Sequence, residues 1–97
     1  MTKAIWNDTV LADSDQTVII EGNHYFPPDS IDKSLFEASE TKSTCPWKGE
    51  ASYYHVNVGG KANRDAAWYY PNPLGSAADI KNYVAFWKGV KVVAGPG

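Results

Sequence analysis

One short segment of the chain, residues 43–50, brings together a thiol, an ammonium, a carboxylate and an indole. A lysine close to a cysteine can stabilise the thiolate, which is the nucleophilic form of the side chain. Cys45 is therefore a candidate nucleophile, with Lys48 as the group that lowers its pKa. Either His24 or His55 would move the proton, if the fold brings it near. A free cysteine is more commonly a small buried apolar residue, so a structural role for Cys45 is the alternative.

The sequence contains no recognisable metal or phosphate site. Cys45 and the two histidines, His24 and His55, show no spacing such as Cys-x-x-Cys or His-x-x-x-His, which zinc sites use. The run Gly59-Gly60-Lys61 lacks the Gly-x-x-x-x-Gly-Lys-Ser/Thr frame of a phosphate-binding loop. We therefore predict that the chain holds no metal and no cofactor.

Aromatic side chains form the second group that can carry a function. The chain has four Trp and six Tyr, and aromatic residues make up 13% of it. Within strands, the neighbouring rings of Tyr53-Tyr54 and of Trp68-Tyr69-Tyr70 point to opposite faces. One set must face away from the main core, where it can line a pocket, contact a partner or lie under loops. The side chains we expect to bind a ligand are those of Tyr25, Cys45, Trp47, Lys48, Tyr53 and Trp68.

Short strands are expected to position these groups. Runs of β-branched and aromatic residues between turn residues predict strands at residues 4–6, 9–12, 17–21, 52–58, 66–70, 83–87 and 90–93. The alternation in residues 52–58 places Tyr54 and Val56 on one face, and Tyr53 and His55 on the other. The pattern predicts a mainly β fold made of short antiparallel strands.

Two segments are predicted to interrupt the strands. Residues 37–44 are polar and are expected to form a loop. Residues 77–82 are expected to form one short helix, because Ser76 can act as its N-cap and Asp79 can complete a capping box. The chain as a whole, residues 1–97, is predicted to be a compact single domain.

Composition restricts the partners and the compartment. The net charge of −2 gives no field that would attract nucleic acid or an anionic membrane. A single cysteine cannot form an internal disulfide, and no charged-then-apolar leader is visible at the start of the sequence. We therefore predict a cytoplasmic protein that binds neither nucleic acid nor a membrane. Its oligomeric state is left open.

Three motifs, in order along the chain, resemble the family called domain of unknown function 427. They are Thr-Cys-Pro-Trp-Lys-Gly at residues 44–49, Ala-Trp-x-Tyr-Pro at residues 67–71 and Tyr-Val-Ala-Phe at residues 83–86. The resemblance implies a compact β-rich fold similar to the tent-like sheets of the Mss4-like class. The resemblance does not imply a zinc site, because this sequence lacks the two Cys-x-x-Cys pairs that hold zinc in some members of that class. The matched positions that it marks as site candidates are Cys45, Pro46, Trp47, Lys48, Gly49, Tyr53, Trp68 and Tyr70.

Three functions are compatible with these patterns. The first is binding of a small molecule in an aromatic-lined pocket, with Lys48 as its one directed charge. The second is an enzyme that uses Cys45 as a reactive thiol with Lys48 and His55. The third is a protein–protein interaction module that uses exposed aromatic residues or an open edge strand. The first is our leading hypothesis, and whether the chain is an enzyme stays open.

Overall fold

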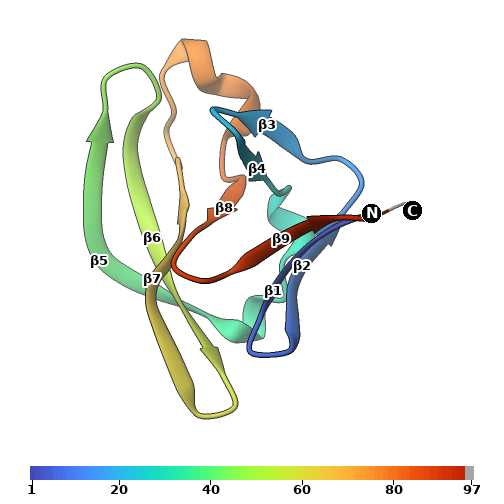
Figure 1. The fold of residues 1–97 in the computed structure, drawn as a ribbon. Helices are drawn as coiled ribbons and strands as arrows, with labels where there is room; N and C mark the ends of the chain where they lie inside the picture. Colours follow the sequence, from blue (N-terminus) through green and yellow to red (C-terminus); the bar gives the residue numbers. More distant parts are fainter. Residues whose placement is uncertain (96–97) are drawn as a thin grey trace.

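Nine strands and three short 3-10 helices follow one another in the computed structural model, which describes residues 1–95 (Figure 1). The strands are β1 (Thr2–Trp6), β2 (Thr9–Ser14), β3 (Val18–Ile20), β4 (Asn23–Tyr25), β5 (Phe36–Cys45), β6 (Gly49–Val58), β7 (Lys61–Tyr69), β8 (Val84–Phe86) and β9 (Lys91–Ala94). The 3-10 helices are η1 (Pro28–Ser30), η2 (Lys33–Leu35) and η3 (Gly75–Ile80). The predicted mainly β fold is confirmed. No helix in residues 1–95 combines the length and the apolar character needed to cross a membrane.

The strands form three antiparallel sheets. The largest has the order β5-β6-β7-β8, the second has the order β2-β1-β9, and β3 pairs with β4 alone. The turn between β1 and β2 is made by Asn7 and Asp8, whose φ angles of 50° and 60° lie in the left-handed region. Asn and Asp tolerate this region better than most residues. The hairpin predicted from this pair therefore has its turn at Asn7 and Asp8.

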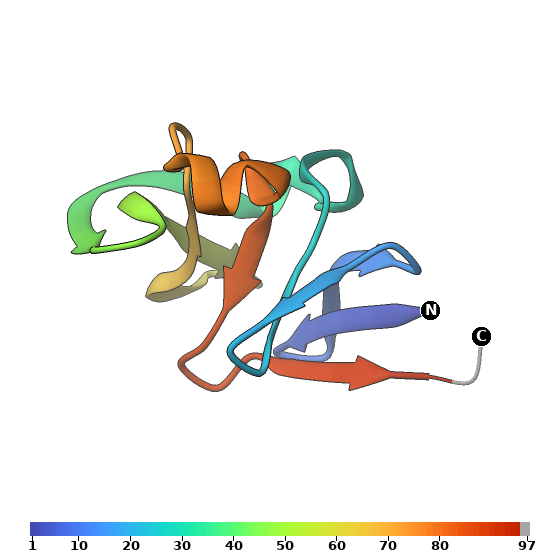
Figure 2. The same ribbon diagram turned by 90° about the horizontal axis from the view of Figure 1, so that it is seen from above.

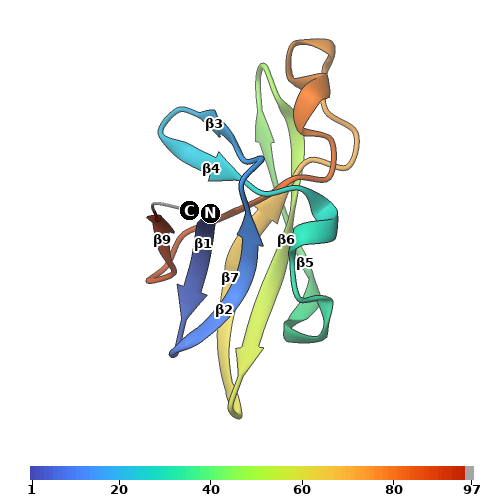
Figure 3. The same cartoon turned by 90° about the vertical axis from the view of Figure 1, so that its right-hand side faces the viewer.

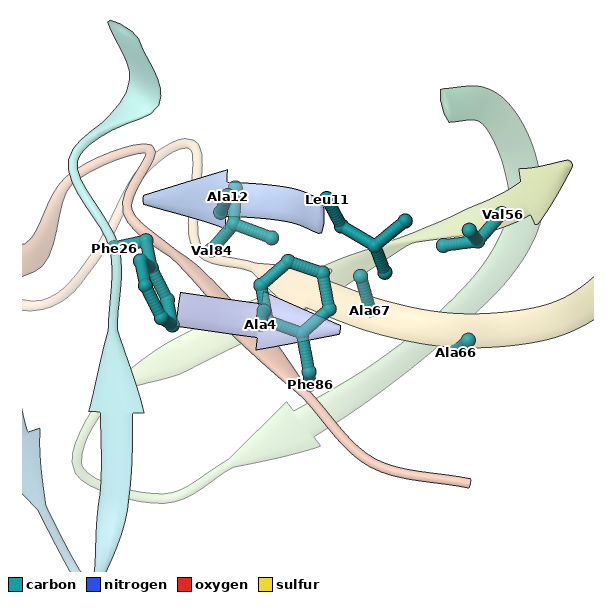
Figure 4. Close-up of a cluster of buried hydrophobic side chains, with 9 residues drawn as sticks. All are labelled: Ala4, Leu11, Ala12, Phe26, Val56, Ala66, Ala67, Val84 and Phe86. Carbon is teal, nitrogen blue, oxygen red and sulfur yellow. The ribbon is translucent and has the colours of Figure 1, made fainter. Parts of the chain in front are cut away.

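The main hydrophobic core lies between the two larger sheets. Figure 3 shows β1 and β2 across the face of β6 and β7, and Figure 4 shows the side chains between them. The buried members are Ala4, Leu11, Ala12, Phe26, Val56, Ala66, Ala67, Val84 and Phe86. Tyr54 packs against this core from the same side as Val56, which confirms the alternation predicted for β6.

A second apolar cluster lies on the opposite face of the large sheet. The β3–β4 hairpin and η3 cover one end of this face, and both lie at the same end of the molecule as the β5–β6 turn (Figure 1 and Figure 2). Its buried members are Tyr25, Ala51, Tyr70, Ala77, Ile80 and Ala85. Tyr53 and Trp68 lie at the margin of this cluster and are only partly buried. This face therefore has a covered end and an open end.

Two local predictions were wrong. Residues 37–44 form most of the edge strand β5, whose side chains are largely exposed, so its polar composition reflects missing cover rather than a loop. The short helix is the 3-10 helix η3, in which Ser76 does not act as a cap. The Ser76 hydroxyl instead donates to the main-chain carbonyl of Trp47 at 2.7 Å and ties η3 to the β5–β6 turn.

Both neighbours of β6 bulge near its centre. Between Ala38 and Lys42, four residues of β5 advance while β6 advances by two, from Tyr54 to Ser52. The same mismatch occurs in β7, between residues 63 and 67. Bulges bend the chain and redirect side chains, and they are common beside functional sites. Here residues 39–41 of β5 and 64–66 of β7 lie within the bulges, on either side of β6.

Gly49, the first residue of β6 after the β5–β6 turn, is expected to accept a side chain only at a cost in stability. Its φ is +109°, and an added Cβ would lie 3.3 Å from the Asn72 carbonyl oxygen and 3.4 Å from the Leu74 nitrogen. Gly60 also has a positive φ, +80°, but faces open space. Gly49→Ala should therefore lower the free energy of unfolding by about 1 kcal/mol more than Gly60→Ala. Urea denaturation measures both, and equal losses would show that the contact with Asn72 and Leu74 yields without cost.

Candidate functional site

The open end of the large sheet carries three aromatic side chains in contact. Tyr53 of β6 and Trp68 of β7 are direct partners in the sheet, and Trp87 follows β8. The Trp68 and Trp87 rings meet edge to face, with centroids 5.9 Å apart and an interplanar angle of 80°. Together the three rings line a small, open recess of about 130 Å³. The indole of Trp87 is the most accessible part, since 47% of this residue is exposed.

Buried partners hold the aromatic recess in place. The Trp68 indole N–H donates to the hydroxyl of Tyr25 at 3.2 Å, and the two rings are nearly perpendicular. Tyr25 itself is buried and is the last residue of β4 in the β3–β4 hairpin. On the other side, the hydroxyl groups of Tyr53 and Ser43 are 2.8 Å apart. Rings fixed in this way lose little freedom when a ligand binds, which favours affinity.

A polar recess adjoins the aromatic one along β6. Its volume is about 420 Å³. Its polar lining consists of Glu37, Ser39, Glu40, Thr41, His55, Arg64 and Asp65. His55 and Tyr53 are two residues apart on β6, so they share a face and their backbones are about 7 Å apart. The Trp87 indole N–H donates to the main-chain carbonyl of Asp65, which links the two recesses directly.

Asp65 is the centre of the polar recess. Its carboxylate accepts from the Ser39 hydroxyl at 2.5 Å and from the Thr41 hydroxyl at 2.8 Å. These contacts pass over β6, because β6 separates β5 from β7 in the sheet. They form because both flanking strands bulge at this level. Asp65 also has a φ of 55°, an uncommon value for a residue with a side chain.

His55 is held between these two bulges. Its Nδ1 accepts the main-chain N–H of Asp65 at 3.0 Å, so in the neutral ring the proton lies on Nε2. The same Nδ1 is 3.5 Å from the Asp65 carboxylate. The Ser39 hydroxyl keeps the pKa of Asp65 below its ordinary value, and the Thr41 hydroxyl and the nearby His55 and Lys88 act in the same direction against a modest burial effect. The recess therefore contains a fixed, ionised carboxylate at neutral pH.

Lys48 lies at the other end of the same sheet face, and its charge is already paired. Its side chain is only 6% exposed and forms an ion pair with Glu21 at the tip of the β3–β4 hairpin. The ammonium also lies 4.7 Å from the centroid of the Trp47 ring and 5.9 Å from that of Tyr70. Burial opposes the charged form, but the hydrogen bond with Glu21 and the electrostatic attraction of Tyr25, Glu21 and Cys45 together outweigh it, so the pKa of Lys48 is raised. Lys48 thus fastens the hairpin to the sheet.

The structure separates Cys45 from His55 and pairs His24 with another residue. Cys45 lies at the end of β5, opposite Gly49, and packs at the margin of the second cluster. His55 is six residues further along β6 than Gly49, which places it about 20 Å away. The Nδ1 of His24 lies 2.8 Å from the Thr17 hydroxyl, within its own hairpin. Beside Cys45, burial raises the pKa of Tyr70 and keeps its phenol neutral.

Comparison with known proteins identifies the family. A family model described as domain of unknown function (DUF427) matches residues 1–94. The chain belongs to this family. No match is found among the curated proteins. The resemblance stated from the three motifs is thereby confirmed for DUF427, and it carries no assigned activity with it.

In this DUF427 domain, the predicted ligand-binding residues fall into two groups by their position on the sheet. Tyr53 and Trp68 line the aromatic recess, and Tyr25 supports it from below. The remaining three, Cys45, Trp47 and Lys48, lie around the β5–β6 turn at the covered end.

Sequence reasoning missed Trp87, Arg64 and Asp65. For Trp87 a signal existed in the sequence. This aromatic residue is the last one before the turn residues Lys88-Gly89, so it could be expected at the end of the predicted strand 83–87. Arg64 and Asp65 gave none, since the bulge that displays them depends on pairing with β6.

Proposed function

We propose that this DUF427 domain binds a small molecule on the open face of its large sheet, with the aromatic recess as the platform. The observation that carries the proposal is the cluster of Tyr53, Trp68 and Trp87, whose rings line one open recess, with Trp87 47% exposed. Flat or apolar groups of a ligand stack on such rings and gain about 0.5–1.5 kcal/mol beyond simple burial.

The neighbouring polar recess supports this reading by size. Sites for small molecules typically enclose about 300–1,000 Å³. The aromatic recess alone is below that range at about 130 Å³, whereas the polar recess next to it adds about 420 Å³. The aromatic platform therefore belongs to a site of the usual volume only if the adjoining polar recess is part of the same site. Apolar walls with a few directed polar groups are the usual composition of such sites.

The reactive-thiol alternative receives less support from the geometry. The ammonium of Lys48 faces Glu21, so its charge is already balanced by a carboxylate. Of the two candidate bases, His55 lies about 20 Å from Cys45 along β6, and the Nδ1 of His24 is paired with the Thr17 hydroxyl at 2.8 Å.

Amide and indole N–H signals in a two-dimensional NMR spectrum test the proposal against a set of neutral aromatic fragments. We expect shifts that cluster at Tyr53, Trp68 and Trp87, and at least a fivefold loss of affinity in Trp87→Ala. Trp47→Ala is the matched control, because Trp47 is 38% exposed and lies at the other end of the sheet face. Fragments that bind at Trp47 instead, or shifts scattered over the surface, would contradict the proposed site.

A further inference from the structure

Some polar groups of the polar recess are hydrogen-bonded within the protein, and others are not. Ser39, Thr41 and Asp65 satisfy one another, and the Nδ1 of His55 is taken by the main chain. Within residues 1–95, the side chain of Arg64 and the Nε2 of His55 make no hydrogen bond. Unused acceptor oxygens are present as well, on the exposed carboxylate of Glu40 and on that of Glu37, whose Oε1 already accepts from the Asn57 amide at 3.1 Å. The unused set thus contains donors and acceptors side by side.

This mixture discriminates between classes of ligand. A phosphate or carboxylate would be attracted by Arg64 but would face the carboxylates of Glu37, Glu40 and Asp65 at close range. An organic cation would be attracted by those carboxylates but repelled by Arg64, and by Lys88, whose ammonium already lies 5.1 Å from the Trp87 ring. A hydroxyl group donates one hydrogen bond and accepts others, so it matches both kinds of unused group at once.

We propose that the site takes a neutral, hydroxylated ring compound, a sugar or a related cyclic polyol, that spans the two recesses. The proposal rests on the function proposed above and names its ligand class. The ring or its apolar substituent lies against Trp87 and Trp68, and its hydroxyl groups face Arg64, His55 and the two glutamates. The spacing fits, because the backbones of Tyr53 and His55, one residue in each recess, are about 7 Å apart along β6. One sugar ring with one substituent covers that distance.

Probes with and without hydroxyl groups test the ligand class separately from the aromatic site. Phenyl β-D-glucoside, phenyl β-D-galactoside and phenyl α-D-mannoside carry the hydroxyl groups, and 2-phenoxytetrahydropyran has the same scaffold without them. Titration followed by the indole N–H signals of Trp68 and Trp87 gives each dissociation constant. We expect the best glycoside to bind at least tenfold tighter than the deoxygenated probe. Phenyl phosphate should bind more weakly than that glycoside.

Variants assign the selectivity to the polar recess. In Arg64→Met the ratio between glycoside and deoxygenated probe should fall towards one. Lys61→Met is the matched control, since Lys61 is an exposed cation at the start of the same strand, outside both recesses, and the ratio should persist. Equal affinities for the two probes in the native chain, a ratio unaffected by Arg64→Met, or tighter binding of phenyl phosphate would each overturn the ligand class while leaving the aromatic site in place. Binding of none of the probes would overturn the aromatic site, and the ligand class with it.

Discussion

Replacing Glu21 with alanine is expected to lower the free energy of unfolding by about 2–3 kcal/mol, whereas Lys48→Met should lower it by no more than about 1 kcal/mol. The two partners differ in burial: the Lys48 side chain is 6% exposed and the Glu21 side chain is 57% exposed. Removing Glu21 leaves a buried ammonium without its anion. Removing Lys48 returns an accessible carboxylate to water, and methionine keeps the apolar contact with Trp47 and Tyr70.

Urea denaturation at neutral pH measures both losses. An unchanged slope of the unfolding free energy against urea concentration shows that the transition stays two-state. The double variant should resemble Lys48→Met alone, because Glu21 has no partner to lose once the ammonium is absent. If Lys48→Met costs as much as Glu21→Ala, the charge of Lys48 stabilises the fold by more than its pairing with Glu21, and the asymmetric interpretation is wrong.

The same pair predicts a dependence on alkaline pH. Because the pKa of Lys48 is raised above its ordinary 10.5 in the folded chain, its contribution is complete below that value and is lost as the pH rises through the folded pKa. The difference in stability between the native chain and Lys48→Met should therefore be constant from pH 6 to about pH 10 and change only above it.

Local pattern was enough to predict the elements that build the site face. Tyr53 and Tyr54 were assigned to opposite faces because side chains alternate in a strand, and the two clusters confirm it. The turn at Asn7-Asp8 was likewise predictable, since it depends on two adjacent residue types. The edge strand β5 was not, because an exposed edge lacks the apolar alternation that marks half-buried strands.

What sequence reasoning could not supply is the pairing of distant residues. Lys48 and Glu21 are 27 positions apart, and only the position of the β3–β4 hairpin over the sheet brings them together. Lys48 was therefore predicted to face a ligand, whereas its ammonium faces Glu21. Similarly, Ser39 and Asp65 meet across β6 only because two bulges occur at the same level.

Asp65 is expected to be the most sensitive polar residue of the candidate site, and Asp65→Ala should lower the free energy of unfolding by about 2–3 kcal/mol. Two effects add. The variant loses the acceptor of the Ser39 and Thr41 hydroxyls, and alanine tolerates the φ of 55° less well than aspartate does. Asp65→Asn keeps the tolerance for this φ and one acceptor oxygen, so it should cost about half as much.

The pH dependence distinguishes the carboxylate from the backbone effect. Because the pKa of Asp65 is lowered in the folded chain, its contribution is present above the ordinary value of 3.8 and is lost as the pH falls through the folded pKa. The stability gap between the native chain and Asp65→Asn should therefore close in acid, while the gap between Asp65→Asn and Asp65→Ala, which includes the φ effect, should narrow much less. Urea titrations at pH 7 and near pH 2.5 measure both gaps. A native–Asn gap that persists in acid would show that the charge of Asp65 does not hold the two bulges together, and the polar recess would then owe its shape to the backbone alone.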